Sequence, residues 1–315
     1  MERSSGFHVV LGTGALGLAV ARALRRRELP VRMINRSGRI ASPPAGADVV
    51  RGDLTDDAGA REITRDARVI YHCAAPAYTD WLQRFPPLQR AIVAAAAHAG
   101  ARLVVAENLY GYGPVDGPLV ETLPLAATGR KGRLRAALTE ELLAAHAAGT
   151  VAVTIGRGSD FFGPHVAGSA VGDRFFRAAL AGAPVDVLGD GDAAHSYTFI
   201  DDFGEALALL GQHDQALGRA WHVPNAPAVS NLRFAELAIE AAGSAARPRV
   251  VPRWLLRTLG LFNPPVRELL ETLYQFERPF VADGGAFTKA FGFAATPLEE
   301  SLAATVRWYR SAQKA

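Results

Sequence analysis

Three glycines near the start of the chain have a spacing that suits a phosphate-binding turn. They form the pattern G-x-G-x-x-G. In this pattern the first glycine makes a tight turn, the second lets the backbone approach a pyrophosphate, and the third lets a helix pack closely on a strand. The first turn of that helix adds backbone N–H donors and a partial positive charge. The predicted dinucleotide-binding residues are Gly12, Thr13, Gly14, Ala15, Leu16 and Gly17.

The elements around the glycines supply the context that this motif needs. The apolar run 7–11 predicts a buried strand, and 19–27 predicts a helix. A lone G-x-G-x-x-G is a weak signal in a chain with 31 glycines, but here it joins a strand to a helix. This context favours dinucleotide binding over the alternative, a merely structural glycine turn.

The end of the second predicted strand, 31–34, indicates which dinucleotide binds. An Asp or Glu at this position would bind the 2′-hydroxyl of NAD. The chain has Asn35 and Arg36 instead, with Arg39 nearby. A guanidinium suits a 2′-phosphate, although a solvated loop arginine is the alternative. We therefore predict NADP(H) as the cofactor, with Asn35 and Arg36 in its site.

A third predicted strand, 47–50, is followed by residues that suit an adenine. Asp53 can hydrogen-bond the adenine amino group while Leu54 covers the face of the ring. Asp53 or Thr55 can also cap the helix predicted over 57–64, and this role is compatible with adenine binding.

The fourth predicted strand, 68–71, leads into small residues that allow close approach to a ribose and a phosphate. Cys73, Ala74 and Ala75 are therefore assigned to the cofactor site. A catalytic pair formed by His72 and Cys73 is rejected, because adjacent residues on a strand point to opposite faces.

Strand and helix continue to alternate with short connections. The next elements are a helix over 86–99, a fifth strand over 102–105, a helix over about 129–148 and a sixth strand over 151–155. This order predicts the α/β class, with a doubly wound parallel sheet of the Rossmann type that binds its ligand at the carboxyl ends of the strands.

Past the sixth strand the alternation loosens. Helices are predicted over 173–182, 203–211, 230–243, 253–277 and about 297–311. We predict an NADP-binding Rossmann domain over 1–160, completed by later strand segments. A smaller, mostly helical substrate region over 161–315 is interleaved with it.

Composition excludes several classes of partner. The 315 residues are 49% hydrophobic with a net charge of +3, and no dense Lys/Arg block suggests nucleic acid. A single cysteine suits a reducing compartment. The start of the chain lacks a signal-peptide core, and no apolar run reaches membrane-spanning length. We expect a cytoplasmic protein without membrane contact and, because the eight histidines lack partners at ligand spacing, without a metal site.

Several segments together resemble the extended short-chain dehydrogenase/reductase family, the NAD(P)-dependent epimerases, dehydratases and reductases of sugars and related alcohols. They are the glycine motif, 52–54, 72–75 and 106–114, with 157–164 similar to R-x-x-N-x-Y-G-P and 195–202 similar to R-D-F-x-x-V-x-D. The resemblance spans nearly the whole chain. It implies that Gly158 and Ser159 lie near the nicotinamide amide.

The catalytic positions of the family are not kept. The family uses a Ser or Thr on the fifth strand and Y-x-x-x-K in the next helix, where the tyrosine moves a proton and the lysine lowers its pKa. The Ser/Thr position falls on Ala106. The tyrosine and lysine positions fall on Thr128 and Gly132 in one register, and on Gly132 and Ala136 in another. The chain therefore resembles an atypical member.

Four residues are candidates for an altered proton relay: Tyr110, Glu107, Asn108 and Lys131. Family dehydratases carry an acidic pair at the positions of Glu107 and Asn108, so Glu107 matches the acid while Asn108 has lost the base. Lys131, or Arg135 four residues later, can lower the pKa of Tyr110. The alternatives are that Tyr110 packs under Gly111 and Pro114, and that Glu107 forms a surface salt bridge.

Two features of the second half imply a substrate of low polarity. His195 stands where sugar-nucleotide enzymes of the family carry a diphosphate-binding arginine, and a neutral imidazole binds a diphosphate poorly. This disfavours a nucleotide sugar. Five aromatic residues lie where the family places its substrate lid, although aromatic residues at helical spacing are usually core. They are Trp254, Phe262, Tyr274, Phe276 and Phe280.

These observations predict an NADP(H)-dependent oxidoreductase or epimerase-like isomerase. Its small-molecule substrate would be a modestly polar carbonyl, alcohol or imine compound, and its proton relay would be non-standard. The alternative is a non-catalytic NADP(H)-binding regulator or sensor. The resemblance also implies a homodimer in which the Ala-rich helices 86–99 and 129–148 pair between subunits.

Overall fold

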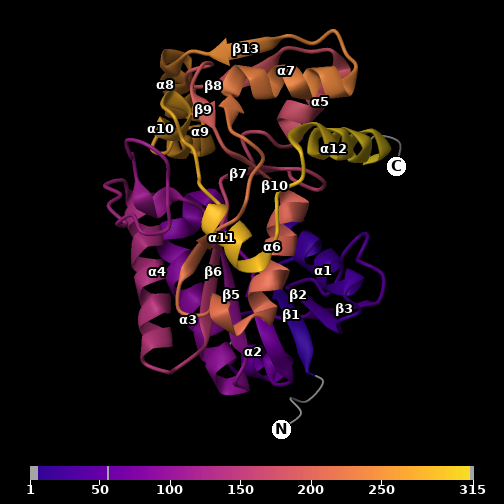
Figure 1. The fold of residues 1–315 in the computed structure, drawn as a ribbon, viewed down its shortest axis with the longest axis vertical. Coiled ribbons are helices and arrows are strands. Elements are labelled where there is room, and N and C mark those ends of the chain that lie inside the picture. The colour runs from indigo at the N-terminus through magenta and orange to yellow at the C-terminus, as the bar shows by residue number, and fades with distance from the viewer. Residues whose placement is uncertain (1–5, 55–56, 313–315) are drawn as a thin grey trace. The chain divides into compact units, whose positions relative to one another are not determined.

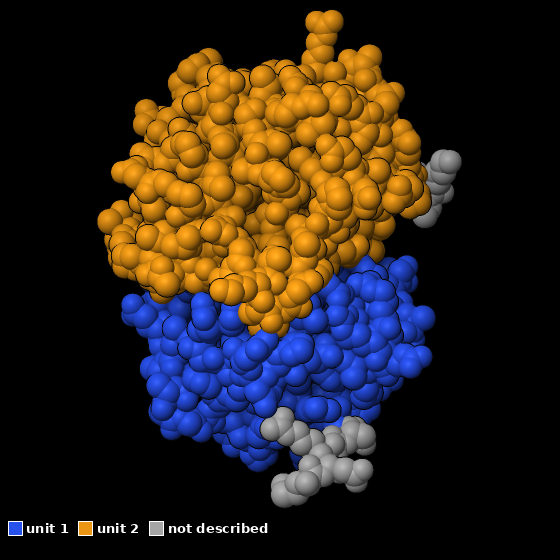
Figure 2. Space-filling model, in the orientation of Figure 1, with its two compact units in different colours: residues 1–107, 134–157, 203–221 blue, residues 108–133, 158–202, 222–315 orange. Residues whose placement is uncertain are grey.

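The computed structural model of the chain describes residues 6–54 and 57–312. The chain forms two compact units, drawn in blue and orange in Figure 2. Unit 1 comprises residues 1–107, 134–157 and 203–221, and unit 2 comprises 108–133, 158–202 and 222–315. The units alternate along the sequence, and the functional division predicted at residue 160 stays a prediction.

The sheet of unit 1 has seven strands in the order β11-β6-β5-β4-β1-β2-β3 (Figure 1). The pairs that join β3, β2, β1, β4, β5 and β6 are all parallel. Chain order reverses between β1 and β4, as in a doubly wound sheet. The prediction of a Rossmann-type fold is confirmed. The strands are β1 (Phe7–Leu11), β2 (Val31–Asn35), β3 (Ala47–Arg51), β4 (Ala67–His72), β5 (Arg102–Glu107), β6 (Val153–Arg157) and β11 (Ala220–His222).

Helices flank this sheet because its central strands are apolar on both faces. Val9, Val10 and Leu11 of β1 are all fully buried. The flanking helices are α1 (Ala15–Arg26), α2 (Asp57–Thr64), α3 (Trp81–Ala99), α4 (Arg130–Ala147) and α6 (Ile200–Gln212), with 3₁₀ turns η1 (Tyr78–Asp80) and η3 (Asp214–Ala216). Helices α4 and α6 each begin in unit 2 and continue into unit 1.

Helix α3 begins earlier than the sequence predicted. It starts at Trp81 rather than at residue 86, and it contains Pro86 and Pro87. The additional first turn is held by aromatic packing, since the Trp81 and Phe85 rings lie 5.4 Å apart, edge to face. Proline lacks an N–H donor and is tolerated best in the first turn of a helix, which is why the sequence predicted a start at residue 86. In the structure the two prolines are the sixth and seventh residues of α3, so they lie inside the helix and do not mark its boundary.

Unit 2 consists of short strand pairs and helices around an aromatic core. The strands are β7 (Asp160–Phe162) with β10 (Tyr197–Phe199), β8 (Val185–Leu188) with β13 (Pro248–Val251), and β9 (Ala194–His195) with β12 (Val229–Ser230). The helices are α5 (Asp173–Ala181), α7 (Asn231–Ala242), α8 (Arg253–Phe262), α9 (Pro264–Leu269), α10 (Tyr274–Glu277), α11 (Gly285–Phe291) and α12 (Leu298–Ala312), with the 3₁₀ turn η2 (Tyr110–Tyr112). Phe162, Phe176, Phe234 and Tyr309 are buried at its centre.

The single long helix predicted over 253–277 is wrong, because the segment forms α8, α9 and α10. Asn263 ends α8 and caps α9, where its Oδ1 accepts a hydrogen bond from Val266 N–H at 3.3 Å. Pro264 then starts α9, since its ring cannot continue the preceding helix. No helix within the described ranges combines the length and the apolar character needed to span a membrane.

Candidate cofactor and active site

The glycine turn of unit 1 has the shape that its spacing predicts. Gly12 has φ +95°, and a Cβ atom there would lie 2.7 Å from the backbone nitrogen of Ala74 on the neighbouring strand end. A Cβ atom at Gly17 would overlap the carbonyl oxygen of Gly12. A Cβ atom at Gly14 would have no neighbour within 4 Å. Gly12 and Gly17 therefore build the turn, and Gly14 leaves an open space above it.

Helix α1 begins at this open space. Gly14 is its N-cap residue, and no side chain caps the helix there. Leu18 N–H donates to the Gly14 carbonyl at 3.0 Å, so the N–H groups of the preceding turn point out of the helix start. An exposed, uncapped helix start beside a residue without a side chain fits a pyrophosphate. The observed cradle thus suits the dinucleotide that the motif predicted.

Asn35 at the end of β2 organises the adjoining loop. Its amide nitrogen donates to Thr13 Oγ1 and to the Arg39 carbonyl, both at 2.9 Å. Its Oδ1 accepts from Gly38 N–H at 2.6 Å and from the Ser37 hydroxyl at 3.0 Å. Asn35 thereby ties this loop to the glycine turn. Arg36 is exposed beside it, and no carboxylate of the described chain forms an ion pair with it.

The remaining predicted cofactor residues of unit 1 lie at the same edge of the sheet. Asp53 is exposed, whereas Leu54 is buried in the apolar core that contains Val9 and Ile34. Thr55, the other candidate cap of the helix predicted over 57–64, lies outside the described residues. Cys73 N–H donates to the Leu11 carbonyl at 2.9 Å, which brings the end of β4 beside the glycine turn. Burial raises the pKa of the Cys73 thiol to about 12, so this thiol stays neutral.

His72 is buried in the core of unit 1 and not presented to a ligand. It is 2% exposed, its ring lies 6.3 Å from that of Phe85, and neither ring nitrogen has a hydrogen-bond partner within the described chain. Burial, and secondarily the nearby charge of Arg135, lowers the pKa of His72 to about 3.

Glu107 lies in a buried cluster of charges at the ends of β5 and β6. Thr139 of α4 donates its hydroxyl hydrogen bond to the carboxylate, with both oxygens at 2.9 Å. Arg157 Nε donates to Glu107 at 3.1 Å, and Arg135 forms a second ion pair at 3.3 Å. All three charged side chains are at most 4% exposed. The salt bridge considered for Glu107 therefore exists, but it is buried and involves two arginines.

This cluster is typical of a structural junction. Its three charged groups come from β5, α4 and β6, and the register places Glu107 opposite Arg157 on adjacent strands. A carboxylate held by two guanidinium groups and a hydroxyl has little freedom to deliver a proton to a substrate. The role of Glu107 as a catalytic acid stays a prediction that its contacts do not favour.

Asn108 and Tyr110 begin the first segment of unit 2. Asn108 Oδ1 accepts a hydrogen bond from Tyr110 N–H at 3.1 Å and so shapes the turn η2. Tyr110 lines a cavity of about 180 Å³. The other residues around this cavity are Gly113, Pro114, Ala127, Thr128, Gly129, Gly132, Glu271, Thr272 and Tyr274. Tyr110 thus faces the segment in which the resemblance places the family's tyrosine and lysine.

The Tyr110 carbonyl and the Ala127 side chain leave no room for a side chain at position 132, on which the family's lysine falls in one register and its tyrosine in the other. A Cβ atom at Gly132 would lie 2.8 Å from the Tyr110 carbonyl oxygen and would overlap the Ala127 side chain. Lys131, next to it, is buried and its ammonium pairs with Glu268. The hydrogen bond from Lys131 lowers the pKa of Glu268. Lys131 as a group that tunes Tyr110 stays a prediction.

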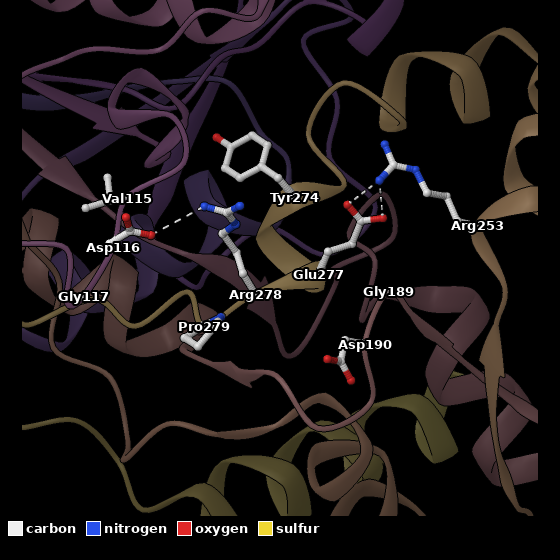
Figure 3. A pocket seen from close by; sticks show the side chains of 10 residues that line it. All are labelled: Val115, Asp116, Gly117, Gly189, Asp190, Arg253, Tyr274, Glu277, Arg278 and Pro279. Atoms are coloured by element: carbon white, nitrogen blue, oxygen red, sulfur yellow. Dashed lines mark hydrogen bonds and ion pairs between the residues drawn. The ribbon is translucent and has the colours of Figure 1, made fainter.

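A larger cavity of about 720 Å³ also lies within unit 2 (Figure 3). Its walls carry charge: Arg253 pairs with Glu277 at 2.9 Å, and Arg278 pairs with Asp116 at 3.8 Å. The remaining lining residues are Val115, Gly117, Gly189, Asp190, Tyr274 and Pro279. Sequence reasoning missed this set because its members come from separate segments that no local spacing connects.

The predicted aromatic lid does not form as one apolar surface. Phe276 and Phe280 are buried in the core, whereas Trp254 and Phe262 are 67% and 86% exposed. Tyr274 lines both of the cavities described above, and the other four aromatic residues line neither. The preference for core packing of aromatic residues thus holds for two of the five.

His195 is a core residue of unit 2. It is fully buried, stacked on Phe276 with a ring separation of 4.9 Å, and its Nε2 lies 3.2 Å from Asp160 Oδ2. It lines neither of the two cavities described above. Ser159 is also buried, with its N–H donating to Thr198 Oγ1 at 2.9 Å. The nicotinamide role of Gly158 and Ser159 stays a prediction.

Comparison with known proteins gives consistent results. The model of the NAD dependent epimerase/dehydratase family matches residues 9–223. A curated relative, dTDP-glucose 4,6-dehydratase of Streptomyces griseus, is 26% identical over 276 residues, which cover 82% of this chain and 76% of the relative. The solved dTDP-glucose 4,6-dehydratase of Streptomyces venezuelae, with NAD bound, has a TM-score of 0.77 at 20% identity over 97% of each chain.

A second solved structure has the same fold. It is the UDP-glucuronic acid 4-epimerase of Bacillus cereus in complex with NAD, with a TM-score of 0.77 at 16% identity over 98% of each chain. The family match covers the strand–turn–helix cradle, the Glu107 junction and the turn at Tyr110. The chain therefore belongs to the NAD-dependent epimerase/dehydratase family.

Proposed function

We propose that this chain is an NADP(H)-dependent enzyme that oxidises or reduces a hydroxyl- or carbonyl-bearing carbon of a small substrate, as an oxidoreductase or an isomerase. The observation that carries the proposal is the open cradle at Gly14 before the uncapped start of α1. When bound, the cofactor supplies hydride transfer; the chain's own residues bind, orient and handle the proton.

The choice of NADP(H) is supported by the end of β2. The side-chain amide of Asn35 already forms hydrogen bonds with Thr13 and with Gly38 of its own loop. No carboxylate takes the place of the acid that binds a 2′-hydroxyl, and exposed Arg36 can donate two parallel hydrogen bonds to a 2′-phosphate.

The substrate we propose is a sugar nucleotide, in which a diphosphate joins the sugar to a nucleoside. A cavity of about 720 Å³ is large enough for such a molecule, and Arg253 and Arg278 in its wall can exchange their carboxylate partners for phosphate oxygens. The similar enzymes named above act on dTDP-glucose and UDP-glucuronic acid. This proposal reverses two expectations drawn from the sequence: His195 disfavoured a nucleotide sugar, and the aromatic residues implied a substrate of low polarity.

Tyr110 is our candidate for proton transfer. It lines the cavity of about 180 Å³, which shares Tyr274 with the larger cavity proposed for the substrate. The carboxylate of Glu107, by contrast, is held by Arg135 and Arg157. Asn108 is used to shape the turn that carries Tyr110.

Replacement of Tyr110 tests this assignment. Tyr110→Phe removes one hydroxyl and should leave NADPH affinity and the melting temperature unchanged. Loss of a general acid should lower turnover of dTDP-glucose or UDP-glucuronic acid about 10²- to 10⁴-fold. Tyr78→Phe, which changes a half-buried tyrosine in unit 1, is the matched control. If Tyr110→Phe turns over the substrate as fast as Tyr78→Phe, Tyr110 does not transfer the proton.

A non-catalytic NADP(H)-binding regulator is the second candidate. It is favoured by Ala106 and Gly132, which have neither the hydroxyl nor the ammonium that the family uses. Wild-type protein that binds NADPH tightly but turns over neither sugar nucleotides nor simple carbonyl and imine compounds would support this alternative over the enzyme.

A further inference from the structure

The large apolar side chains that are exposed on the described chain are concentrated in one short segment. They are Leu82 (42%), Val250 (44%), Trp254 (67%), Leu259 (47%), Leu261 (75%) and Phe262 (86%). All but Leu82 lie within residues 250–262. Scattered exposed apolar residues need no explanation, but a contiguous group of this kind marks an interaction site.

Helix α8 divides these residues between two faces. Leu256 and Gly260, four residues apart, are buried, and Leu256 packs with Val251, Leu273 and Phe276. Trp254 and Leu261 are seven residues apart and therefore share a face, with Phe262 beside them. Helices α8, α9 and α10 lie together next to β8 and β13 (Figure 1). The helix is thus anchored by one face and presents the other to its surroundings.

Positive charge accompanies this face. Residues 241–267 contain five arginines and no Asp or Glu, in a chain whose basic and acidic residues otherwise nearly balance. Arg249 pairs with Asp186 and Arg253 pairs with Glu277. For Arg257 and Arg267, both exposed, no carboxylate partner exists within the residues the structure describes. Arg257 lies three residues after Trp254 and so borders the apolar face.

The charge decides between possible occupants. A second copy bound through the same face would place two arginine-rich surfaces against each other. An anionic lipid surface complements both parts, because Trp, Phe and Leu enter the boundary between headgroups and acyl chains while arginines meet the headgroups. We propose that Trp254, Leu261, Phe262 and Arg257 of α8, together with exposed Arg267 of the adjoining α9, form the α8 docking face, which attaches the protein peripherally to bilayers rich in anionic phospholipid.

This inference departs from the expectation, drawn from the sequence, of a protein without membrane contact. The prediction of no membrane contact rested on the absence of a long apolar run, which concerns helices that span a bilayer. A helix that lies on a bilayer needs only an apolar face flanked by basic residues.

Vesicle co-sedimentation tests the proposal. Wild type should sediment with vesicles of phosphatidylcholine and phosphatidylglycerol, not with phosphatidylcholine alone, and less as salt rises. Each of Arg257→Gln and Arg267→Gln should weaken binding about fivefold. The double variant Trp254→Ser, Leu261→Ser should reduce it at least as much. The matched control combines Leu82→Ser with Arg61→Gln, an exposed apolar residue and an exposed arginine of unit 1, and should bind like wild type.

Three results would overturn the proposal. The first is wild-type protein that does not sediment with anionic vesicles. The second is a control variant that loses as much binding as the α8 variants. The third is light scattering in which Trp254→Ser, Leu261→Ser abolishes an oligomer of the wild type, since a second copy would then cover the face. Circular dichroism melts check that each variant folds, and the lipid and salt dependence of wild type decides the matter without any variant.

Discussion

Single residues in this chain take their roles from their surroundings more than from their type. Glu107 matches an acid of the family's dehydratases by position, yet Thr139 and two arginines surround its carboxylate. His195 replaces a family arginine, yet it is stacked in the core. Arg36 differs from both because it is exposed and without a carboxylate partner among the described residues. It is therefore the residue whose chemistry remains available to a ligand.

Arg36→Ala should separate the two cofactors. An arginine that pairs with a phosphate contributes about 1.5–3 kcal/mol, so NADPH affinity should fall roughly ten- to a hundredfold. NADH affinity should stay nearly unchanged, because NADH lacks the 2′-phosphate. Fluorescence titration of both cofactors measures the difference, with Arg61→Ala, an exposed arginine elsewhere in unit 1, as the control. Wild type that binds NADPH and NADH equally would contradict this role of Arg36.

At the level of the elements, two glycines of the β1–α1 turn, Gly14 and Gly17, have different structural roles. Gly17 touches the backbone of Gly12, whereas the position of a Cβ atom on Gly14 is open. The spacing alone predicts both tasks, and the structure locates each in a separate contact.

Alanine at these two glycines should give opposite results. Gly17→Ala forces the α1 backbone away from β1 and should destabilise unit 1 by about 1–3 kcal/mol, as overpacking does. Gly14→Ala should keep the free energy of unfolding but weaken NADPH binding, because its methyl group enters the cradle. Urea denaturation and cofactor titration of both variants make the comparison. If Gly14→Ala binds NADPH as tightly as wild type, the pyrophosphate does not bind in this space.

Elements that follow local rules could be predicted from the sequence, and those that depend on distant contacts could not. The alternation of strands and helices through β6 predicted a doubly wound parallel sheet, and the glycine spacing predicted the cradle. The break of 253–277 depends on the Asn263 cap, which a helical pattern of apolar residues does not reveal. The charged cavity brings Asp116, Asp190 and Arg253 together from distant segments, and no periodicity connects them.

Across the whole molecule, charge is nearly balanced but unevenly placed. Thirty-four basic and 31 acidic residues give the net charge of +3, while residues 241–267 contain five arginines and no Asp or Glu. The homodimer expected through the helices corresponding to α3 and α4 stays a prediction. It involves a different surface from the α8 docking face, so light scattering of the α8 variants distinguishes the two.

The stability of the whole molecule should fall in acid because of two buried histidines in its sheet. Burial, and secondarily Arg68, lowers the pKa of His8 to about 4, and burial, then Arg135, lowers that of His72 to about 3. In the unfolded chain both imidazoles bind protons near pH 6.5. The contribution of these two histidines to the free energy of unfolding is therefore fully present above pH 6.5. It is lost as the pH falls towards 4, by up to about 1.4 kcal/mol per pH unit for each histidine.

His72→Met isolates one of these contributions. Methionine fills a similar volume against Phe85 and cannot be protonated, so the slope of unfolding free energy against pH should decrease by about 1.4 kcal/mol per unit between pH 5.5 and 4. Urea denaturation at a series of pH values measures the slope. His98→Gln, which removes an exposed imidazole of α3, controls for the loss of a histidine as such. If wild type and His72→Met lose stability in parallel, His72 takes up its proton in the folded protein and the acid sensitivity arises from other groups.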